Sequence, residues 1–174
     1  NDQGQPLQYN AGGKPMAFFF CDIDAAKDEL KKAEAETGLS GIAITPFPLG
    51  EVFEMGAKQM ALIIPSAEGL EAAGAPAGIN PMGQQVPLFG CMEIQQDLPD
   101  GSSMTPLFFS QSEGEEARDM ALEGTGEDKS TYEVSVIPMA GAVQRQASSG
   151  GKLSYTFVPP QSSLEFLRLA NESN

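Results

Sequence analysis

The run Phe18-Phe19-Phe20-Cys21-Asp22 has the composition of a buried β-strand that leads into an acidic helix start. Leu107-Phe108-Phe109-Ser110-Gln111 has the same form in the second half of the chain and matches it residue by residue. An amphipathic helix is predicted after each run, over residues 25–37 and 113–122, because apolar residues recur there at helical spacing. The two runs therefore predict two copies of one strand–helix unit.

The sequence also marks the ends of these helices. Gly38 suits a left-handed residue at the end of the first helix. Ser112 and Glu115 have the spacing of a capping box at the start of the second. Acidic residues gather at both helix starts, where the helix dipole favours negative charge, and capping explains them better than a pair of catalytic acids. These residues are Asp22, Asp24, Asp28, Glu113, Glu115 and Glu116.

Further matches follow in the same order in both halves of the chain. They are a strand that meets a proline (42–47 and 134–139), a short apolar helical turn (49–53 and 140–144), another strand (60–65 and 153–159) and a final helix (67–71 and 162–166). Each match alone is weak, because strand–helix patterns recur in α/β proteins by chance. Their shared order is stronger evidence and favours an internal duplication.

We therefore predict an α/β (α+β layered) fold in a single domain over residues 1–174. The domain is expected to contain two pseudo-symmetric strand-helix-strand-strand-helix repeats that share one mixed sheet. The first repeat covers about residues 1–84 and the second about residues 85–174. A stretch rich in Ala, Gly and Pro, residues 72–83, separates them.

The second repeat has a leading strand that the first lacks. Residues 85–93 read as a strand before a turn around Asp100, whereas the first repeat offers only a turn at residues 2–7. If the duplication is real, the partner strand is expected before Asn1.

The charge balance excludes two classes of function. Ten Lys and Arg face 24 Asp and Glu, which gives a net charge of −14. Such a surface repels phosphate groups, so the sequence argues against nucleic-acid binding and against polybasic binding to a membrane. No apolar run approaches the roughly 20 residues that a transmembrane helix needs.

The sequence lacks the residues of common catalytic and metal sites. It has no histidine, which removes Ser-His-Asp and Cys-His arrangements and imidazole zinc sites. Residues 124–130 resemble a phosphate loop, but their spacing is wrong and they carry acids where phosphate would sit. We therefore predict no enzymatic activity, no catalytic residues, no cofactor and no metal.

The two cysteines allow two interpretations. Cys21 and Cys91 could be buried free thiols that act as small hydrophobic residues. They could also form one disulfide, which would require adjacent strands and an oxidising compartment.

The order of the elements resembles the Tic-twenty-two-like family of plastid and cyanobacterial protein-import factors. The resemblance rests on short hydrophobic motifs that cover nearly the whole chain. They are Asp2-Gln3-Gly4-Gln5-Pro6-Leu7, Met16-Ala17-Phe18-Phe19-Phe20, Val86-Pro87-Leu88-Phe89, Pro106-Leu107-Phe108-Phe109-Ser110, Val134-Ser135-Val136, Tyr155-Thr156-Phe157-Val158-Pro159-Pro160 and Ser163-Leu164-Glu165-Phe166-Leu167. The sequence departs from the family in the missing opening strand, in Gly114 within the second helix and in the linker. The resemblance implies a non-catalytic, chaperone-like role in a plastid intermembrane space or a periplasm.

Two functions follow as hypotheses. The first is a protein-binding factor that shields apolar segments of proteins in transit. The second is a structural or linker subunit of a plastid membrane complex, such as a photosynthetic supercomplex, to which the protein would attach peripherally or at the thylakoid. Short apolar turns on a surface mark protein contacts, although ordinary core packing is the alternative for each residue. The residues expected to bind partners are Leu49, Val52, Phe53, Met139 and Val143.

Overall fold

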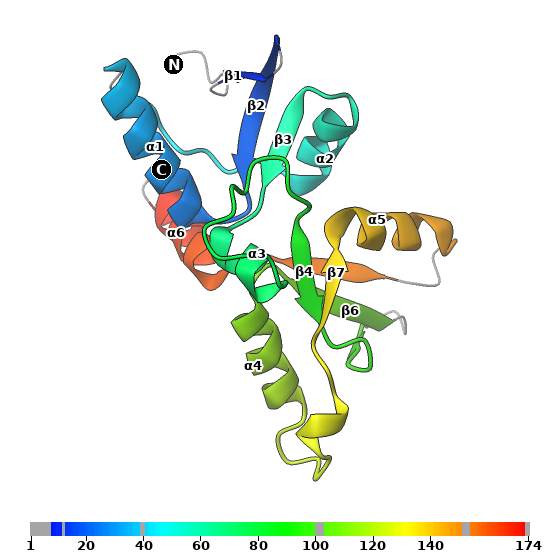
Figure 1. Ribbon diagram of the computed structural model, residues 1–174. Helices are drawn as coiled ribbons and strands as arrows, with labels where there is room; N and C mark the ends of the chain where they lie inside the picture. Colours follow the sequence, from blue (N-terminus) through cyan, green and yellow to red (C-terminus); the bar gives the residue numbers. More distant parts are fainter. Residues whose placement is uncertain (1–7, 12, 39–40, 100–102, 151–153, 173–174) are drawn as a thin grey trace. The chain divides into compact units, whose positions relative to one another are not determined.

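The computed structural model describes residues 8–11, 13–38, 41–99, 103–150 and 154–172 (Figure 1). Its chain divides into two compact units. Unit 1 consists of Asn1–Ser66, Asn80–Gln84 and Gln161–Asn174, and unit 2 consists of Ala67–Ile79 and Gln85–Pro160. The fold is a mixed α/β fold, as predicted. Within the described residues, however, the strands form two sheets and not one sheet shared by both halves.

The described part of unit 1 contains a three-stranded sheet and three helices. Its elements are β1 (Gln8–Ala11), β2 (Lys14–Phe20), α1 (Ile23–Thr37), α2 (Leu49–Ala57), β3 (Ala61–Ile64) and α6 (Gln161–Glu172). The strand order is β1-β2-β3, with β1 antiparallel and β3 parallel to β2. Parallel strands need a long crossover, and α1 and α2 lie in the chain that makes it.

Alternation along β2 sends its side chains to two different faces of the sheet. On one face Phe18 stacks on Tyr9, with 4.3 Å between ring centroids, and the Tyr9 hydroxyl donates to Oε1 of Glu29 on α1 at 3.2 Å. On the opposite face Ala17 is buried, and the ring of Phe19 contacts that of Phe47. Helix α1 therefore covers the Phe18 face, and α2 packs along β3 (Figure 1).

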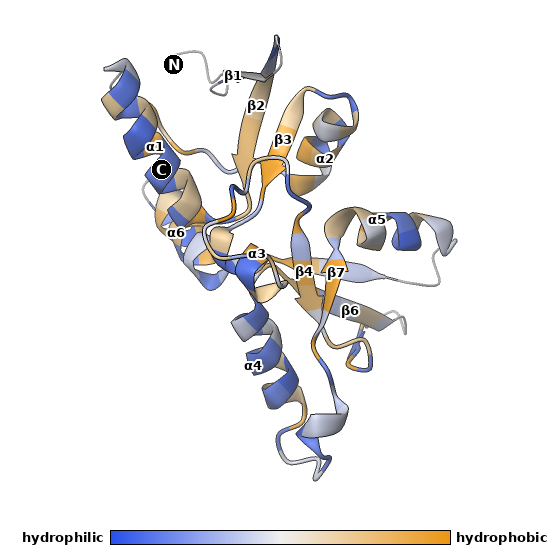
Figure 2. Ribbon diagram, in the orientation of Figure 1, coloured by the Kyte–Doolittle hydropathy of each residue, from blue (hydrophilic) through white to orange (hydrophobic). Residues whose placement is uncertain are grey.

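Unit 2 contains a larger sheet. Its elements are α3 (Ala67–Ala72), β4 (Pro87–Gly90), β5 (Gln96–Asp97), β6 (Ser103–Phe108), α4 (Gln111–Ala121), a 3₁₀ helix η1 (Lys129–Thr131), β7 (Ser135–Pro138), α5 (Met139–Ser148) and β8 (Tyr155–Val158). β4 pairs antiparallel with β6 and β7, β6 pairs parallel with β8, and β5 pairs with the start of β6. In unit 1, Figure 2 shows that strands β2 and β3 are more apolar than helix α1.

The core of unit 2 lies where β4 pairs with β6. Leu88, Phe89 and Leu107 are fully buried there. Gly90 permits this close approach, because a Cβ at this position would lie 2.6 Å from Cδ2 of Leu107 and 2.9 Å from the carbonyl oxygen of Pro106. Any other residue at position 90 would push the two strands apart.

Both units contain one parallel strand pair followed by a helix, but the match drawn from sequence is shifted by one residue. Phe20 pairs with Ile64 at the end of β2, and Phe108 pairs with Val158 at the end of β6. The structure therefore equates Phe20 with Phe108, whereas the sequence match had equated it with Phe109. Three consecutive apolar residues in each run hide the alternation that would reveal the register. The internal duplication, with repeats over 1–84 and 85–174, stays a prediction.

Residues 42–47 do not form the predicted strand. The segment is outside regular secondary structure, although Ile42 and Ile44 are half-buried and Ala43 and Thr45 are exposed, as in a strand. Prolines flank Phe47 on both sides and cannot donate ladder hydrogen bonds. The strand pattern is present, but no described strand pairs with it.

Helix boundaries also differ from the predictions. The N-cap of α4 is Ser110, so Ser112 lies inside the helix and the expected capping box with Glu115 is wrong. The short turns predicted after residues 48 and 138 are the full helices α2 and α5, and the final helix α6 continues to Glu172. Gly38 ends α1 in the left-handed conformation, as predicted. The predicted turn at residues 2–7 and the partner strand before Asn1 lie outside the described residues.

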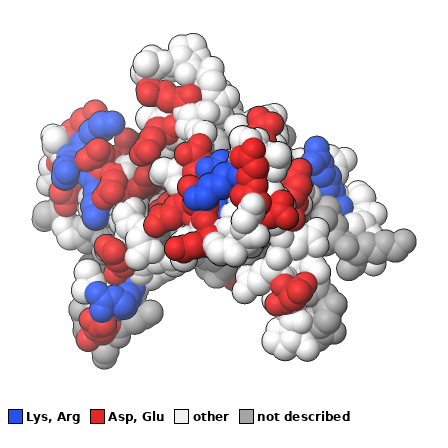
Figure 3. All heavy atoms as spheres, turned by 90° about the horizontal axis from the view of Figure 1, so that it is seen from below, with Lys and Arg blue, Asp and Glu red and all other residues white. Residues whose placement is uncertain are grey.

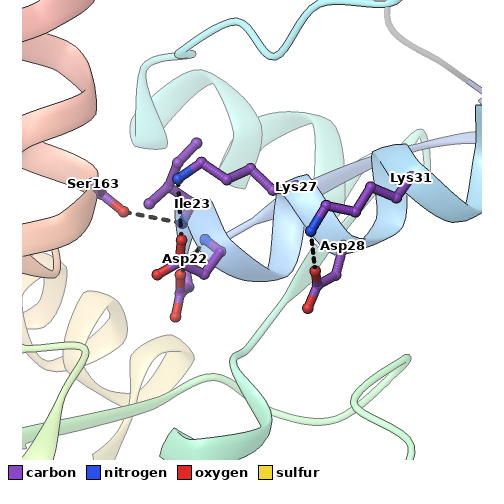
Figure 4. A network of polar contacts seen from close by, with 7 residues as sticks. Asp22, Ile23, Lys27, Asp28, Lys31 and Ser163 are labelled. Atoms are coloured by element: carbon purple, nitrogen blue, oxygen red, sulfur yellow. Dashed lines mark hydrogen bonds and ion pairs between the residues drawn. The ribbon is translucent and has the colours of Figure 1, made fainter.

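The last helix of each predicted repeat belongs to the compact unit formed mainly by the other repeat. Helix α3 is the last helix of the first repeat but packs with β4 in unit 2. Helix α6 is the last helix of the second repeat but packs with α1 in unit 1. Figure 4 shows the polar part of the α1–α6 contact. The Asp22 carboxylate accepts from the Asp24 amide at 2.6 Å, and Oγ of Ser163 accepts from the Ile23 amide at 3.1 Å. The start of α1 is therefore capped by its own chain and by α6 together.

Replacing Ser163 by alanine should lower the free energy of unfolding by about 1 kcal/mol, because the Ile23 amide loses its acceptor. Chemical denaturation monitored by circular dichroism measures this. Ser162→Ala is the matched control on the same turn and should change the stability by less than about 0.5 kcal/mol. Equal effects of the two substitutions would contradict a capping role for Ser163.

Replacing Gly114 by alanine should raise the free energy of unfolding by about 0.5–1 kcal/mol, because alanine is the better helix former. Its Cβ would lie 3.5 Å from Cβ of Phe89, which is ordinary van der Waals contact. Gly90→Ala should have the opposite effect, since its Cβ overlaps Leu107. Loss of stability in Gly114→Ala would show that α4 lies closer to β4 than described.

Candidate protein-binding surface

Helix α2 begins directly after Pro48, which brings the extended chain into the helix with φ −61° and ψ 125°. Val52 is 3% exposed and anchors the helix in the core of unit 1. Leu49 and Phe53 are half-buried, and Glu51 and Glu54 point into solvent. Of the partner-binding residues predicted on this helix, Val52 is a core residue and the other two reach the surface only in part.

Helix α5 of unit 2 begins in the same way after Pro138, with φ −59° and ψ 131°. Met139 is 5% exposed, and its amide donates to the carbonyl oxygen of Val86 at 2.9 Å. Ala142 is fully buried, and Val143 is half-buried. Met139 is thus a core residue as well, and Val143 is the predicted residue of α5 that reaches the surface.

Each helix carries a stripe of small residues around its half-buried apolar side chain. Residues three and seven positions apart share one face of a helix. On α2 this face presents exposed Gly50, half-buried Phe53 and exposed Ala57. A Cβ added at Gly50 would meet no atom within 4 Å, so the face is open.

The corresponding face of α5 presents exposed Ala140, half-buried Val143 and exposed Ala147. We name the two faces the α2 stripe (Gly50, Phe53, Ala57) and the α5 stripe (Ala140, Val143, Ala147). Small neighbours leave the central apolar side chain accessible to a partner from the side. The sequence identified both central residues but not the small residues around them.

Other large apolar side chains are more exposed, and the sequence analysis missed them. They are Phe47, Met60, Met82, Met120, Val136, Leu164 and Leu169. Phe47 is 47% exposed, and its ring centroid lies 5.3 Å from that of Phe19. The two prolines around Phe47 were the available signal, because they argue against the buried strand to which it had been assigned.

Carboxylates outnumber basic groups in the sequence and on the face of the molecule that Figure 3 shows. Most of the described basic side chains pair with a carboxylate at 4 Å or less. Because acidic residues outnumber basic ones, many carboxylates have no basic partner, and the surface keeps an excess of negative charge. These basic residues are Lys27, Lys31, Lys32, Lys58, Arg118, Lys129 and Arg168. A partner with positive charge would be attracted to such a surface.

The pKa values of both cysteines are raised above the ordinary value for a thiol. Burial, and then the neighbouring Asp22 carboxylate, raise the pKa of Cys21 to about 12. Burial also raises the pKa of Cys91, whose Sγ lies 3.2 Å from the Glu93 carboxylate. Both cysteines are free thiols and stay protonated at neutral pH, so the nucleophilic thiolate form is disfavoured.

The carboxylates with lowered pKa have local structural partners. A hydrogen bond from Arg118, then one from Lys129, lowers the pKa of Asp119. Asp128 accepts from the Ser130 amide at the start of η1, which lowers its pKa. In the part of the chain that the structure describes, no three Cys, Asp or Glu side chains converge as metal ligands. Among those same residues, no helix is both long and apolar enough to cross a bilayer.

Comparison with known proteins gives no sequence relative. No protein-family model matches the chain, and no curated protein matches it either. Solved structures do match. Tic22 from Plasmodium falciparum aligns at a TM-score of 0.71 with 19% sequence identity, over 100% of this chain and 91% of that chain. Tic22 from Anabaena, described as a protein of protein transport, aligns at 0.66 with 14% identity, over 97% and 89%. The chain therefore has the Tic22 fold, and the resemblance drawn from sequence is confirmed at the level of the fold.

Alkylation of Cys21 should be at least about tenfold slower in the native protein than in the unfolded chain at pH 8, because a raised pKa removes the thiolate. Between pH 7 and 9 the unfolded chain should react faster with each step in pH, whereas the native rate stays low. Iodoacetamide labelling followed by peptide mass spectrometry separates Cys21 from Cys91. Equal native and unfolded rates would show that Cys21 ionises normally.

Proposed function

We propose that this protein with a Tic22 fold is a non-catalytic binding factor that shields apolar segments of other proteins during their transport. The observation that carries the proposal is the pair of open apolar stripes on α2 and α5. Protein transport is the process given for the Anabaena protein of the same fold. The absence of histidine and the protonated state of both thiols support a role without catalysis.

The stripes have the physical properties that such binding needs. Phe53 and Val143 are each partly buried, so a partner gains apolar contact without the protein exposing a large patch of its own. Full burial of one such side chain contributes about 1.5–3 kcal/mol at most, and the part still exposed here contributes less. Two weak sites of this kind favour reversible binding, and the acidic surface keeps the protein soluble.

The five predicted residues thus receive two roles in this proposal. Val52 and Met139 hold α2 and α5 against the two sheets, and substitutions there would destabilise the fold. Leu49, Phe53 and Val143 reach the surface and would contact the partner. A plastid location in the intermembrane space fits this role.

Replacing Phe53 and Val143 by serine together should remove most of the ability to suppress aggregation of a thermally unfolded client protein. Light scattering of the client, with and without a stoichiometric amount of variant, measures this. Leu169→Ser is the matched control, because it removes an exposed apolar side chain from α6 instead. Full suppression by a folded double variant would contradict the proposed surface.

Purification from the native source separates this proposal from a permanent structural role. Transient association that depends on the presence of clients supports the binding factor. A fixed stoichiometry with a plastid membrane complex that survives salt and detergent would support a linker subunit and contradict the proposal.

A further inference from the structure

Helices α2 and α5 have equivalent places in the two units. Each begins directly after an extended proline, Pro48 or Pro138, and each is followed by the second strand of a parallel pair, β3 or β8. Alignment of the two prolines therefore matches the helices residue by residue. Their C-terminal ends differ at two matched places, and these differences show how firmly each helix is held.

The first difference is the residue that follows the C-cap. The C-cap of α2 is Lys58 and that of α5 is Ser149, and in both units the next residue is left-handed. In unit 2 this residue is Gly150 with φ 62°, a backbone that glycine adopts without steric cost. In unit 1 it is Gln59 with φ 57°, where the Cβ crowds a carbonyl oxygen. The backbone that holds α2 in place is therefore strained, and that of α5 is not.

The second difference is a hydrogen bond between the helix and the strand after it. Oε1 of Gln146, in the last turn of α5, accepts from the Tyr155 amide of β8 at 3.2 Å. Ala61 has the same place in β3, as the first residue of the parallel pairing. The residue matched to Gln146 is Gly56, which has no side chain to form this bond. Helix α2 thus lacks the side-chain contact that ties α5 to its strand.

Both differences reduce the free energy that is needed to detach α2 from β3. Opening relieves the left-handed strain in unit 1, whereas in unit 2 it breaks an additional hydrogen bond. Together these effects favour opening of α2 over opening of α5 by at least about tenfold. Local opening of this kind is an equilibrium within the native state, and weakly held elements open most often.

Detachment would uncover an apolar face of α2 that is only partly accessible while the helix lies along β3 (Figure 1). Leu49, Val52, Phe53 and Gly56 are spaced by three, four and seven positions, so they share one side of the helix. In the closed state Val52 is buried, and Leu49 and Phe53 are half-buried. Opening would join these three large apolar side chains into one continuous face.

We propose that α2 detaches locally from β3 and that an apolar segment of a client protein binds its face of Leu49, Val52 and Phe53 in the open state. Helix α5 stays closed and binds through its stripe alone. This inference rests on the proposed protein-binding role and adds which of the two helices moves. Because only open molecules bind in this way, the apparent affinity scales with the fraction of molecules that are open. A change that closes α2 more firmly therefore weakens binding by the same factor.

Native-state hydrogen exchange measures the opening of each helix. After correction for intrinsic rates, the hydrogen-bonded amides of α2 should exchange at least about tenfold faster than those of α5. Gln59→Gly removes the strain and should slow exchange in α2 about threefold, since the flexibility of glycine in the open state offsets part of the gain. Gly150→Gln is the matched control in unit 2 and should speed exchange in α5 while leaving α2 unchanged.

A variant with a firmly closed α2 tests whether opening serves binding. Gly56→Gln offers a side chain to the Ala61 amide, and a Cβ at position 56 has room, because the nearest atom is the Ala61 carbonyl oxygen at 3.7 Å. Gly56→Gln combined with Gln59→Gly should require about tenfold more protein for half-suppression of client aggregation, although the apolar face is unchanged. Circular dichroism and chemical denaturation verify that this variant is folded and no less stable than the wild type.

The outcomes distinguish this inference from the proposed function. Failure of the wild type to suppress client aggregation would overturn both. Equal suppression by the closed variant and the wild type would leave the binding role standing and overturn the opening of α2. Exchange in α2 that is as slow as exchange in α5 would also overturn it.

Discussion

The parallel pairing of β2 with β3, and of β6 with β8, is the constraint on which the rest of the structure depends. Parallel strands cannot be joined by a tight turn, so the chain must leave the sheet and return over a helix. In unit 1 the return is made by α2, which ends at Ala57, and β3 begins at Ala61. The turn between them requires Gln59 at φ 57°, a left-handed conformation unusual for a residue with a Cβ. The position of α2, and with it the α2 stripe, is thus fixed by the strand that follows.

The same constraint separates anchoring residues from accessible ones. A short helix held against a sheet buries the side that faces the strands, and Val52 and Ala142 lie on that side. Phe53 and Val143 are the next residues in the chain and turn about 100° away from it. Each helix therefore combines a buried anchor with an open apolar stripe, and the proposed binding of other proteins rests on this arrangement. The net charge of −14 repels other copies of the chain and favours positively charged partners.

Each compact unit contains the last helix of the other predicted repeat, so the chain passes between the two units several times. The chain enters unit 2 at Ala67, returns to unit 1 at Asn80, enters unit 2 again at Gln85 and returns at Gln161. Each unit thus needs residues from both halves of the sequence. A cut in the linker would not yield two complete units, although its composition had marked it as the boundary between repeats.

Much of the fold was accessible from the sequence, because strands, helices and the family resemblance depend on local apolar patterns. The sequence predicted the strands at Phe18 and Leu107 and the left-handed end of α1 at Gly38. The register between the halves was not, since three successive apolar residues in each run look alike in either register. The sequence also did not predict which apolar side chains are exposed to solvent. Val52 and Phe53 are adjacent apolar residues in the sequence, and only the sheet beneath α2 decides which one is buried. Likewise, residues 42–47 have a strand pattern, but a strand is completed by hydrogen bonds to another segment. The sequence by itself determined which segments could pair and pack, and the tertiary structure alone decided which of them found a partner, because pairing and burial are properties of two segments and not of one.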